Sequence, residues 1–316
     1  MIKLKYSRII IIGSGPSGCT SSIYICRSNL KPIILTGKTI GGQLNNTYSL
    51  DNWPSIINIK GSDFTFKLIN QLKNFNIEIY FDFIYNVNFL NKPFILIGEK
   101  FFYYSIFIII STGCHYNVFN VKFQLKYVNK NISNCAICDG NFYKNKKICI
   151  IGGGESFFEN LFYLKNLISF KILFIRNKFF KSNFNLIKKF FSIINSHFFI
   201  KLNIFLIEIL GDDFNIFYIK IKNFFNLKIN IIYIDGLFIF IGSVSNSKIF
   251  SGQLKIKKNF LLTKKYQLYK KTITSINYIF ASGDVQDYIY KQAITSSSSG
   301  CVTYFNLIKY YNKFYN

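Results

Sequence analysis

A glycine-rich turn near the start of the chain constrains its fold more than any other feature. Residues 8–12, an arginine followed by four isoleucines, predict a buried β-strand that leads directly into the pattern Gly13-x-Gly15-x-x-Gly18. A helix is expected over about residues 19–29 and a second strand over residues 32–35. Three glycines between a strand and a helix are typical of a βαβ unit that binds a dinucleotide, because the tight turn lets the backbone approach a pyrophosphate at the helix N-terminus.

The same arrangement recurs about 140 residues later. A strand over residues 147–151 leads into Gly152-Gly-Gly154, a helix is expected through about residue 167, and a strand over residues 171–176 completes the unit. Phe157 stands where the fingerprint has glycine or alanine, so we expect its side chain to push the helix away from the strand. The second unit therefore either binds a dinucleotide less well than the first or is kept as a structural part of the fold.

Two basic residues lie at the end of this second unit. Arg176 is about twenty residues beyond the glycines, where a cation would contact the 2′-phosphate that distinguishes NADPH, and Lys181 could assist. The alternative is that both are surface cations of a lysine-rich chain.

The C-terminal part of the chain carries a third signal. A strand is expected over residues 278–281, followed by Gly283-Asp284 and a helix that begins near Gln292. This part has no βαβ unit of its own, so we expect it to complete the first domain. The length of 316 residues suits two domains. The sequence therefore predicts an α/β fold of two Rossmann-like dinucleotide-binding domains, with residues 117–245 inserted between residues 1–116 and 246–316.

The pattern Cys135-Ala-Ile-Cys138, followed by Asp139, predicts redox chemistry. A C-x-x-C turn brings two sulfurs close enough for a disulfide and lowers the pKa of one thiol, and a neighbouring carboxyl can supply a proton. The alternative is half of a zinc site. That would need two further ligands, but the chain has no second C-x-x-C and only two histidines, so no metal is expected.

The charge balance allows a different kind of function. Lys and Arg total 39 against 14 Asp and Glu, a net charge of +25 that could favour nucleic acid or an anionic membrane surface. The basic residues are dispersed along the chain, so a solvated surface is the better interpretation. No run reaches the roughly 18 apolar residues of a membrane span, and a signal peptide does not fit before Gly13. We therefore expect a cytoplasmic protein without nucleic-acid or membrane partners.

Taken in order from about Arg8 to Cys301, the motifs of this chain resemble those of low-molecular-weight thioredoxin reductases. The motifs that carry the resemblance are Gly13-Ser-Gly-Pro-Ser-Gly18, Thr36-Gly37, Gly41-Gly-Gln-Leu44, Asn52-Trp-Pro54, Ser111-Thr-Gly113, Cys135-Ala-Ile-Cys-Asp-Gly140, Gly152-Gly-Gly154, Gly283-Asp284 and Lys291-Gln-Ala-Ile-Thr295.

The resemblance implies an FAD domain built from both ends of the chain and an inserted NADPH domain. Each domain would have three layers, two of β-sheet and one of α-helix (ββα). Electrons would pass from NADPH through FAD to a Cys135–Cys138 disulfide and then to thioredoxin. Cys138 would lie nearer the flavin, and Asp139 would be the acid. The resemblance also implies a homodimer. The implied NADPH contacts are Gly152, Gly154, Arg176 and Lys181. The implied FAD contacts are Gly13, Ser14, Gly15, Pro16, Gly18, Thr36, Gly37, Gly41, Gly42, Gln43, Asn52, Thr112, Gly113, Gly283, Asp284, Lys291, Gln292 and Ala293.

The departures from the family pattern all fall on the nicotinamide side. The family's His-Arg-Arg cluster and later Arg appear here as Ile175-Arg176-Asn177 with Lys181, Phe157 replaces a small residue, and Gly-His-x-Pro-Asn is Gly242-Ser-Val-Ser-Asn246. The choice of NADPH, NADH or another donor is therefore left open. Two alternatives remain beside a thioredoxin reductase: a flavin-dependent dithiol oxidoreductase with a different electron donor, and a basic binding protein that keeps the fold without reductase activity.

Overall fold

The computed structural model describes residues 3–47, 49–117, 119, 121–122, 124–127, 131–168, 170–176, 178–194, 197–266, 269–270 and 272–315. The chain divides into two compact units: Met1–His115 with Val244–Asn316 form unit 1, and Tyr116–Ser243 form unit 2. The chain crosses between them at strands β9 (Cys114–Tyr116) and β18 (Ser243–Ser245), which pair with each other.

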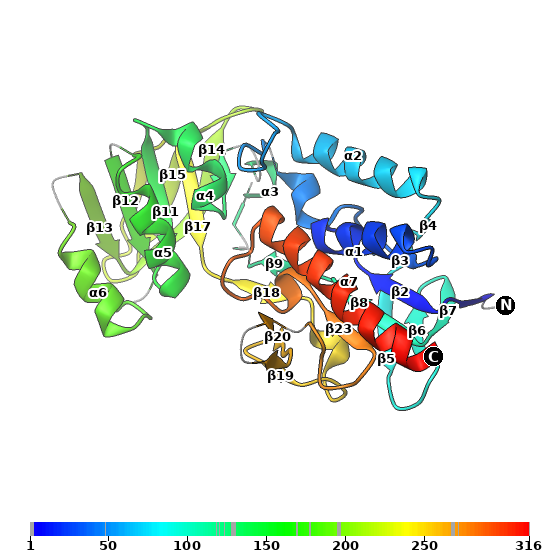
Figure 1. Cartoon of the computed structure of the whole chain (residues 1–316). Coiled ribbons are helices and arrows are strands. Elements are labelled where there is room, and N and C mark those ends of the chain that lie inside the picture. Colours follow the sequence, from blue (N-terminus) through cyan, green and yellow to red (C-terminus); the bar gives the residue numbers. More distant parts are fainter. Residues whose placement is uncertain are drawn as a thin grey trace. The chain divides into compact units, whose positions relative to one another are not determined.

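A parallel five-stranded sheet forms the centre of unit 1 (Figure 1). The C-terminal strand pairs beside strands from the first third of the chain, so both ends of the sequence build this sheet. The strand β2 is buried on both faces, as expected for a parallel sheet covered on both sides. In spatial order the strands are β23 (Ile279–Ala281), β8 (Phe107–Ile110), β2 (Ile9–Ile12), β3 (Ile33–Leu35) and β4 (Glu78–Tyr80).

Alternating side chains of β2 pack into two different cores, because successive residues of a strand point to opposite faces. Ile9 and Ile11 pack against the helices α1 (Pro16–Arg27), α2 (Gly61–Asn74) and α7 (Ala293–Tyr315). Ile10 and Ile12 pack against an antiparallel layer. That layer has the order β1 (Lys3–Tyr6), β7 (Phe101–Ser105), β6 (Phe94–Gly98) and β5 (Ile84–Asn88), with β1 parallel to β7.

Unit 2 repeats this three-layer plan. Ile148 and Ile150 pack toward the helices α5 (Glu155–Leu164) and α6 (Phe184–Phe191), whereas Cys149 and Ile151 pack toward an antiparallel sheet. The parallel sheet has the order β10 (Ile132–Ser133), β17 (Gly236–Phe240), β11 (Lys147–Gly152), β12 (Phe170–Ile175) and β13 (Phe198–Leu202), and the antiparallel sheet has β14 (Ile204–Gly211), β15 (Ile216–Asn223) and β16 (Ile229–Tyr233).

Short elements complete the two units. In unit 2 they are α3 (Gln124–Tyr127), α4 (Ala136–Asp139) and η2 (Gly140–Tyr143); in unit 1 they are η1 (Gly42–Asn46), η3 (Lys248–Phe250), η4 (Gly283–Val285), β19 (Ile256–Lys257), β20 (Phe260–Leu261), β21 (Lys265–Tyr266) and β22 (Tyr269–Lys270). None of the helices in the described ranges is long and apolar enough to cross a membrane.

The helix after the first glycine turn begins at Pro16, three residues earlier than expected. Proline suits the first turn of a helix because the missing N–H would have no partner within the helix there. The second such helix, α5, ends at Leu164, three residues before the expected end.

Candidate functional site

The first glycine turn joins β2 to α1 and is closely packed on its inner side. Gly13 has a φ of 109°, and a Cβ there would lie 2.2 Å from the carbonyl oxygen of Ser111. A Cβ on Gly18 would lie 1.9 Å from the carbonyl oxygen of Gly13. At Gly15 the nearest atom to a Cβ would be 4.0 Å away, and within the described chain no side chain caps the start of α1. The first-turn amides therefore fit a pyrophosphate that approaches beside Gly15.

Serine hydroxyls tie this turn to other segments of unit 1. Ser17 Oγ donates a hydrogen bond of 2.7 Å to Ser282 Oγ, which lies 2.9 Å from Ser111 Oγ. The Oγ of Ser14 accepts a hydrogen bond of 3.0 Å from the amide of Gly41. The turn, the loop before η1 and the end of β23 are thus held together at the carboxyl edge of the parallel sheet, where ligands of such sheets bind.

Asp284 is a partly buried carboxylate at this edge. Its Oδ1 accepts a hydrogen bond of 2.8 Å from Ser296 Oγ, and its Oδ2 lies 3.6 Å from Cys114 Sγ, which donates to it. Burial raises the pKa of Asp284, and the hydrogen bonds from Ser296 and Cys114 oppose that shift. Gln43 Nε2 donates to the carbonyl oxygen of Cys114 and lies 3.5 Å from its Sγ. A carboxylate held in this way fits the sugar-like hydroxyls of FAD.

The other residues expected to hold FAD lie around the same edge of unit 1. Asn52 Nδ2 donates a hydrogen bond of 3.2 Å to Gln292 Oε1. Thr112 Oγ1 donates one of 2.9 Å to the carbonyl oxygen of Asn246. The rest follow strands or begin helices: Thr36 and Gly37 after β3, Gly42 at the start of η1, Gly113 after β8, Gly283 at the start of η4, and Lys291 and Ala293 before and at the start of α7.

The two cysteines of the C-x-x-C pattern form a disulfide in unit 2. Their Cα atoms are 5.3 Å apart, and Cys135 Sγ accepts a hydrogen bond of 3.1 Å from the amide of Cys138 at the start of α4. Ala136 between them is buried, and its amide donates to Asn160 Oδ1 at 3.0 Å, which anchors the turn to α5. Ile137 is exposed. Hydrogen bonds from the backbone amides of Ala136 and Cys138 therefore hold the disulfide-bonded turn in place.

Asp139 lies directly after this disulfide and is a largely buried acid. Its amide donates a hydrogen bond of 3.1 Å to the carbonyl oxygen of Cys135. Its carboxylate accepts a hydrogen bond of 2.5 Å from Ser133 Oγ. Burial raises the pKa of Asp139, and the bond from Ser133 lowers it by a smaller amount. A carboxyl of this kind holds its proton more readily than an exposed one and is suited to proton transfer.

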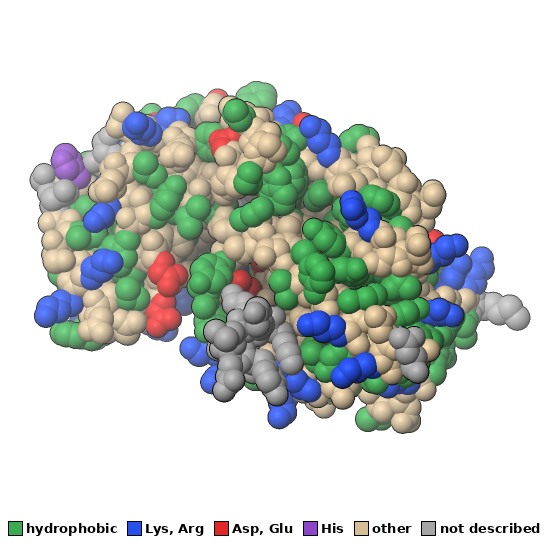
Figure 2. All heavy atoms as spheres, in the orientation of Figure 1, with side chains coloured by type: hydrophobic (Ala, Val, Ile, Leu, Met, Phe, Trp, Pro, Cys, Tyr) green, Lys and Arg blue, Asp and Glu red, His purple; other side chains and the backbone are tan. Residues whose placement is uncertain are grey.

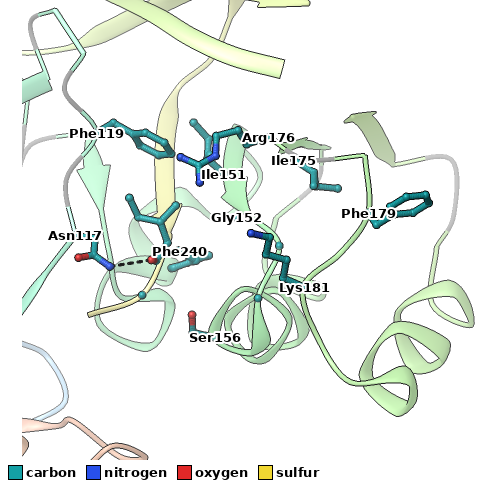
Figure 3. Close-up of a pocket in the computed structure, with 14 residues that line it drawn as sticks. Asn117, Phe119, Ile151, Gly152, Ser156, Ile175, Arg176, Phe179, Lys181 and Phe240 are labelled. Carbon is teal, nitrogen blue, oxygen red and sulfur yellow. Dashed lines mark hydrogen bonds between the residues drawn. The ribbon is translucent and has the colours of Figure 1, made fainter. Parts of the chain in front are cut away.

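The second glycine turn faces a cavity of about 520 Å³ in unit 2. Arg176 and Lys181 both reach it; Figure 3 shows the guanidinium directed toward Phe119 and the amine toward the glycine turn. The amide of Lys181 donates a hydrogen bond of 2.7 Å to the carbonyl oxygen of Gly153, which anchors the lysine beside the turn. Two cations above a glycine turn and a helix N-terminus fit an anionic dinucleotide. The cavity is lined by Asn117, Phe119, Ile151, Gly152, Gly153, Gly154, Ser156, Ile175, Arg176, Phe179, Lys181, Phe240, Ile241 and Gly242.

Phe157, the large residue of the second glycine pattern, is not among the residues that line this cavity. Its side chain is fully buried on the helix side of the sheet, with its ring 5.2 Å from that of Phe158. Gly152 leaves room for the Phe157 side chain, because a Cβ on residue 152 would lie 2.9 Å from the Cβ of Phe157. The large side chain is therefore accommodated in the core beside the glycine. Asn177, another departure from the family pattern, lies outside the described residues.

Three contributors were missed or left without a role in the sequence. Ser133 bonds to Asp139, Cys114 contacts Asp284, and Phe119 lines the cavity. Ser133 and Phe119 belong to no motif, and Cys114 directly follows the motif Ser111-Thr-Gly113. In the described part of the chain no group of three or more His, Cys, Asp or Glu side chains could hold a metal ion.

Comparison with known proteins agrees with this geometry. Residues 7–167 match the model of the family described as pyridine nucleotide-disulphide oxidoreductase. The chain belongs to this family. It is 39% identical over 313 residues to a thioredoxin reductase of Buchnera aphidicola subsp. Schizaphis graminum, covering 98% of each chain. It is also 36% identical to a protein of Pseudomonas fluorescens named glucosaminate ammonia-lyase, covering 98% of this chain and 97% of that one.

Solved structures show the same relationship. The thioredoxin reductase from Streptococcus pyogenes has a TM-score of 0.90 to this chain at 26% identity, covering 98% of this chain and 99% of that one. The thioredoxin reductase from Giardia duodenalis gives the same four values. These likenesses confirm the predicted family and the predicted α/β fold of two dinucleotide-binding domains.

Proposed function

We propose that this chain reduces the disulfide of thioredoxin with electrons from NADPH, and that it does so through the residues described above. The observation that carries the proposal is the Cys135–Cys138 disulfide beside the partly buried acid Asp139, whose pKa is raised by desolvation. In this assignment unit 1 binds FAD and unit 2 binds NADPH. FAD, when bound, supplies the chemistry that accepts a hydride from a nicotinamide and delivers two electrons to a disulfide.

In unit 1, the amides beside Gly15 hold the pyrophosphate and Asp284 holds the ribityl hydroxyls. Gln292, directly before α7, and Ala293, its first residue, would lie near the flavin ring. The tight packing around Gly13 and Gly18 supports this role, because it leaves only the outer side of the turn open to a ligand.

In unit 2, the cavity beside Gly152 and Gly154 binds NADPH. Arg176 and Lys181 contact its 2′-phosphate, and Ser156 lies at the first turn of α5, where an anion is favoured. The position of both cations in one cavity supports NADPH over NADH, since only NADPH carries the additional phosphate.

The Cys135–Cys138 disulfide is first reduced to a dithiol, which then reduces thioredoxin by thiol–disulfide exchange. Two electrons and two protons convert the Cys135–Cys138 disulfide into two thiols, and Asp139 supplies one of the protons. One thiolate then attacks the disulfide of thioredoxin to form a mixed disulfide. The second thiolate displaces the reduced partner and restores the original disulfide. The net reaction consumes NADPH, one proton and oxidised thioredoxin, and it yields NADP⁺ and reduced thioredoxin.

The surface supports a soluble enzyme over a basic binding protein. Figure 2 shows Lys and Arg side chains mostly as separate spots among apolar and polar ones on the visible face. A nucleic-acid or membrane site would need them gathered in one stripe or patch. We therefore propose a cytoplasmic enzyme without nucleic-acid or membrane partners. The proposed homodimer rests on the resemblance alone, and light scattering of the purified chain tests it.

The test is a coupled assay with oxidised thioredoxin. NADPH oxidation should depend on thioredoxin and should fall at least about a thousandfold in Cys135→Ser and in Cys138→Ser, because neither variant can form the disulfide. Cys149→Ser, which changes a buried thiol elsewhere in unit 2, is the control. Release of ammonia from glucosaminate without thioredoxin-dependent NADPH oxidation would contradict the proposal, because that elimination needs no dithiol.

A further inference from the structure

Cys114 occupies a central place in a polar cluster of unit 1. It begins β9, directly after Thr112-Gly113, and its side chain is buried. Gln43 reaches it from η1, contacting both its carbonyl oxygen and its Sγ. The thiol in turn donates to Oδ2 of Asp284 at 3.6 Å. Residues far apart in the sequence are thus connected in one chain of contacts, from Gln43 through Cys114 to Asp284.

The Asp284 carboxylate is held at both of its oxygens. Ser296, on helix α7, donates a hydrogen bond from its Oγ to Oδ1. Cys114, at the start of β9, donates one from its Sγ to Oδ2. Two donors on different oxygens fix the plane of a carboxylate, whereas one donor leaves it free to rotate. The remaining lone pairs then point in fixed directions.

The chemistry of Cys114 suits donation and does not suit nucleophilic attack. Burial raises the pKa of its thiol to about 12, with the negative charge of Asp284 as a second cause. The thiol therefore keeps its proton at neutral pH and can donate a hydrogen bond. A thiolate would be required for exchange or metal binding.

We infer that Cys114 is a positioning residue for the flavin: its thiol fixes the orientation in which the Asp284 carboxylate accepts hydrogen bonds from the ribityl hydroxyls. The inference rests on the proposed function, since it requires FAD in unit 1. Cys114 touches neither substrate nor reacting atoms in this account and acts through Asp284.

The first test is the dissociation constant of FAD for the full-length apoprotein of Cys114→Ala. We expect it to rise about fivefold at pH 8, the size of one modest hydrogen bond. Cys26→Ala is the matched control, because Cys26 Sγ also donates a hydrogen bond in unit 1, but to the carbonyl oxygen of Phe75. Its FAD affinity should stay within twofold of wild type.

The second test is the pH dependence of FAD affinity, which a merely structural effect would not move. Loss of the thiol donor disfavours the ionised form of Asp284, so the affinity of Cys114→Ala should begin to fall at a higher pH than that of wild type. The other charged groups that act on Asp284 are Lys291 and Asp287, and the substitution leaves both unchanged. In an Asp284→Asn background, Cys114→Ala should cause no such shift.

The outcomes separate this inference from the function on which it rests. A wild-type chain that binds no FAD overturns the proposed function itself. A wild-type chain that binds FAD, with Cys114→Ala showing wild-type affinity and pH profile, overturns only the role of Cys114. An equal loss of affinity at every pH, or the same loss in the Asp284→Asn background, also overturns it, because the effect would not pass through the carboxylate.

Discussion

The hydroxyl of Ser133 donates a hydrogen bond of 2.5 Å to the carboxylate of Asp139. The same hydroxyl accepts a hydrogen bond of 3.0 Å from the amide of Cys135. One serine therefore connects the acid to the backbone of the redox-active turn. Burial raises the pKa of Asp139, and this bond opposes the rise by a smaller amount, so Ser133 lowers the upper limit of the pH range in which the acid is protonated.

Replacing Ser133 by alanine should move the activity toward alkaline pH. The bond stabilises the ionised carboxylate, so its loss raises the pKa of Asp139 further, and the protonated acid persists to higher pH. The alkaline limb of the kcat profile for thioredoxin reduction should shift upward. Ser133→Thr keeps a hydroxyl and should leave the limb in place, and Asp139→Asn should abolish it. A shift toward acidic pH in Ser133→Ala would exclude this role.

Phe157→Ala should destabilise unit 2 by about 3–5 kcal/mol, the usual cost of removing a fully buried phenylalanine ring. Calorimetry of the purified chain should show a lower unfolding temperature for Phe157→Ala than for wild type. Phe184→Ala, at a residue on α6 that is 75% exposed, should change stability by less than about 0.5 kcal/mol. A stabilised Phe157→Ala would instead show that the ring strains the glycine turn.

Arg176→Ala and Lys181→Ala should each raise the KM for NADPH about three- to tenfold, because each removes one cation from the cavity. The KM for NADH should change less than twofold, since NADH lacks the 2′-phosphate. Lys189→Ala, on α6 and not among the residues that line the cavity, is the control. Equal increases in KM for NADPH and NADH would instead indicate that the two cations contact the pyrophosphate, which both nucleotides carry.

Gly18→Ala should yield a chain without bound FAD. The added Cβ would lie 1.9 Å from the carbonyl oxygen of Gly13, so the helix must move away from the turn that holds the pyrophosphate. The absorbance ratio of flavin to protein after purification measures the loss. Thr20→Ala, two residues further along α1, should retain FAD. Full flavin content in Gly18→Ala would contradict the assignment of this turn.

The parts of the site that the sequence predicted are those written in short, contiguous patterns. The glycine turns at Gly13 and Gly152 and the C-x-x-C of Cys135 and Cys138 each lie within a few residues, and local geometry determines what they can form. The contact between Cys114 and Asp284 joins residues 170 positions apart, and no local pattern encodes it.

Phe157 illustrates a different limit of sequence analysis. The sequence correctly marked it as unusual for a glycine fingerprint, but its consequence depends on the direction in which the ring packs. The ring lies in a cluster with Phe158 and Phe180, and residues on separate elements build that space. Tertiary packing, which the fingerprint does not contain, determined the outcome.

The most direct measurement of the central claim is the visible spectrum of the purified chain during anaerobic addition of NADPH and then of oxidised thioredoxin. We predict that NADPH bleaches the flavin absorbance and that thioredoxin restores it. In the Cys135→Ser/Cys138→Ser double variant, NADPH should still bleach the flavin, but thioredoxin should restore nothing. A wild-type spectrum that NADPH leaves unchanged, or a double variant that thioredoxin reoxidises as fast as wild type, would contradict the account.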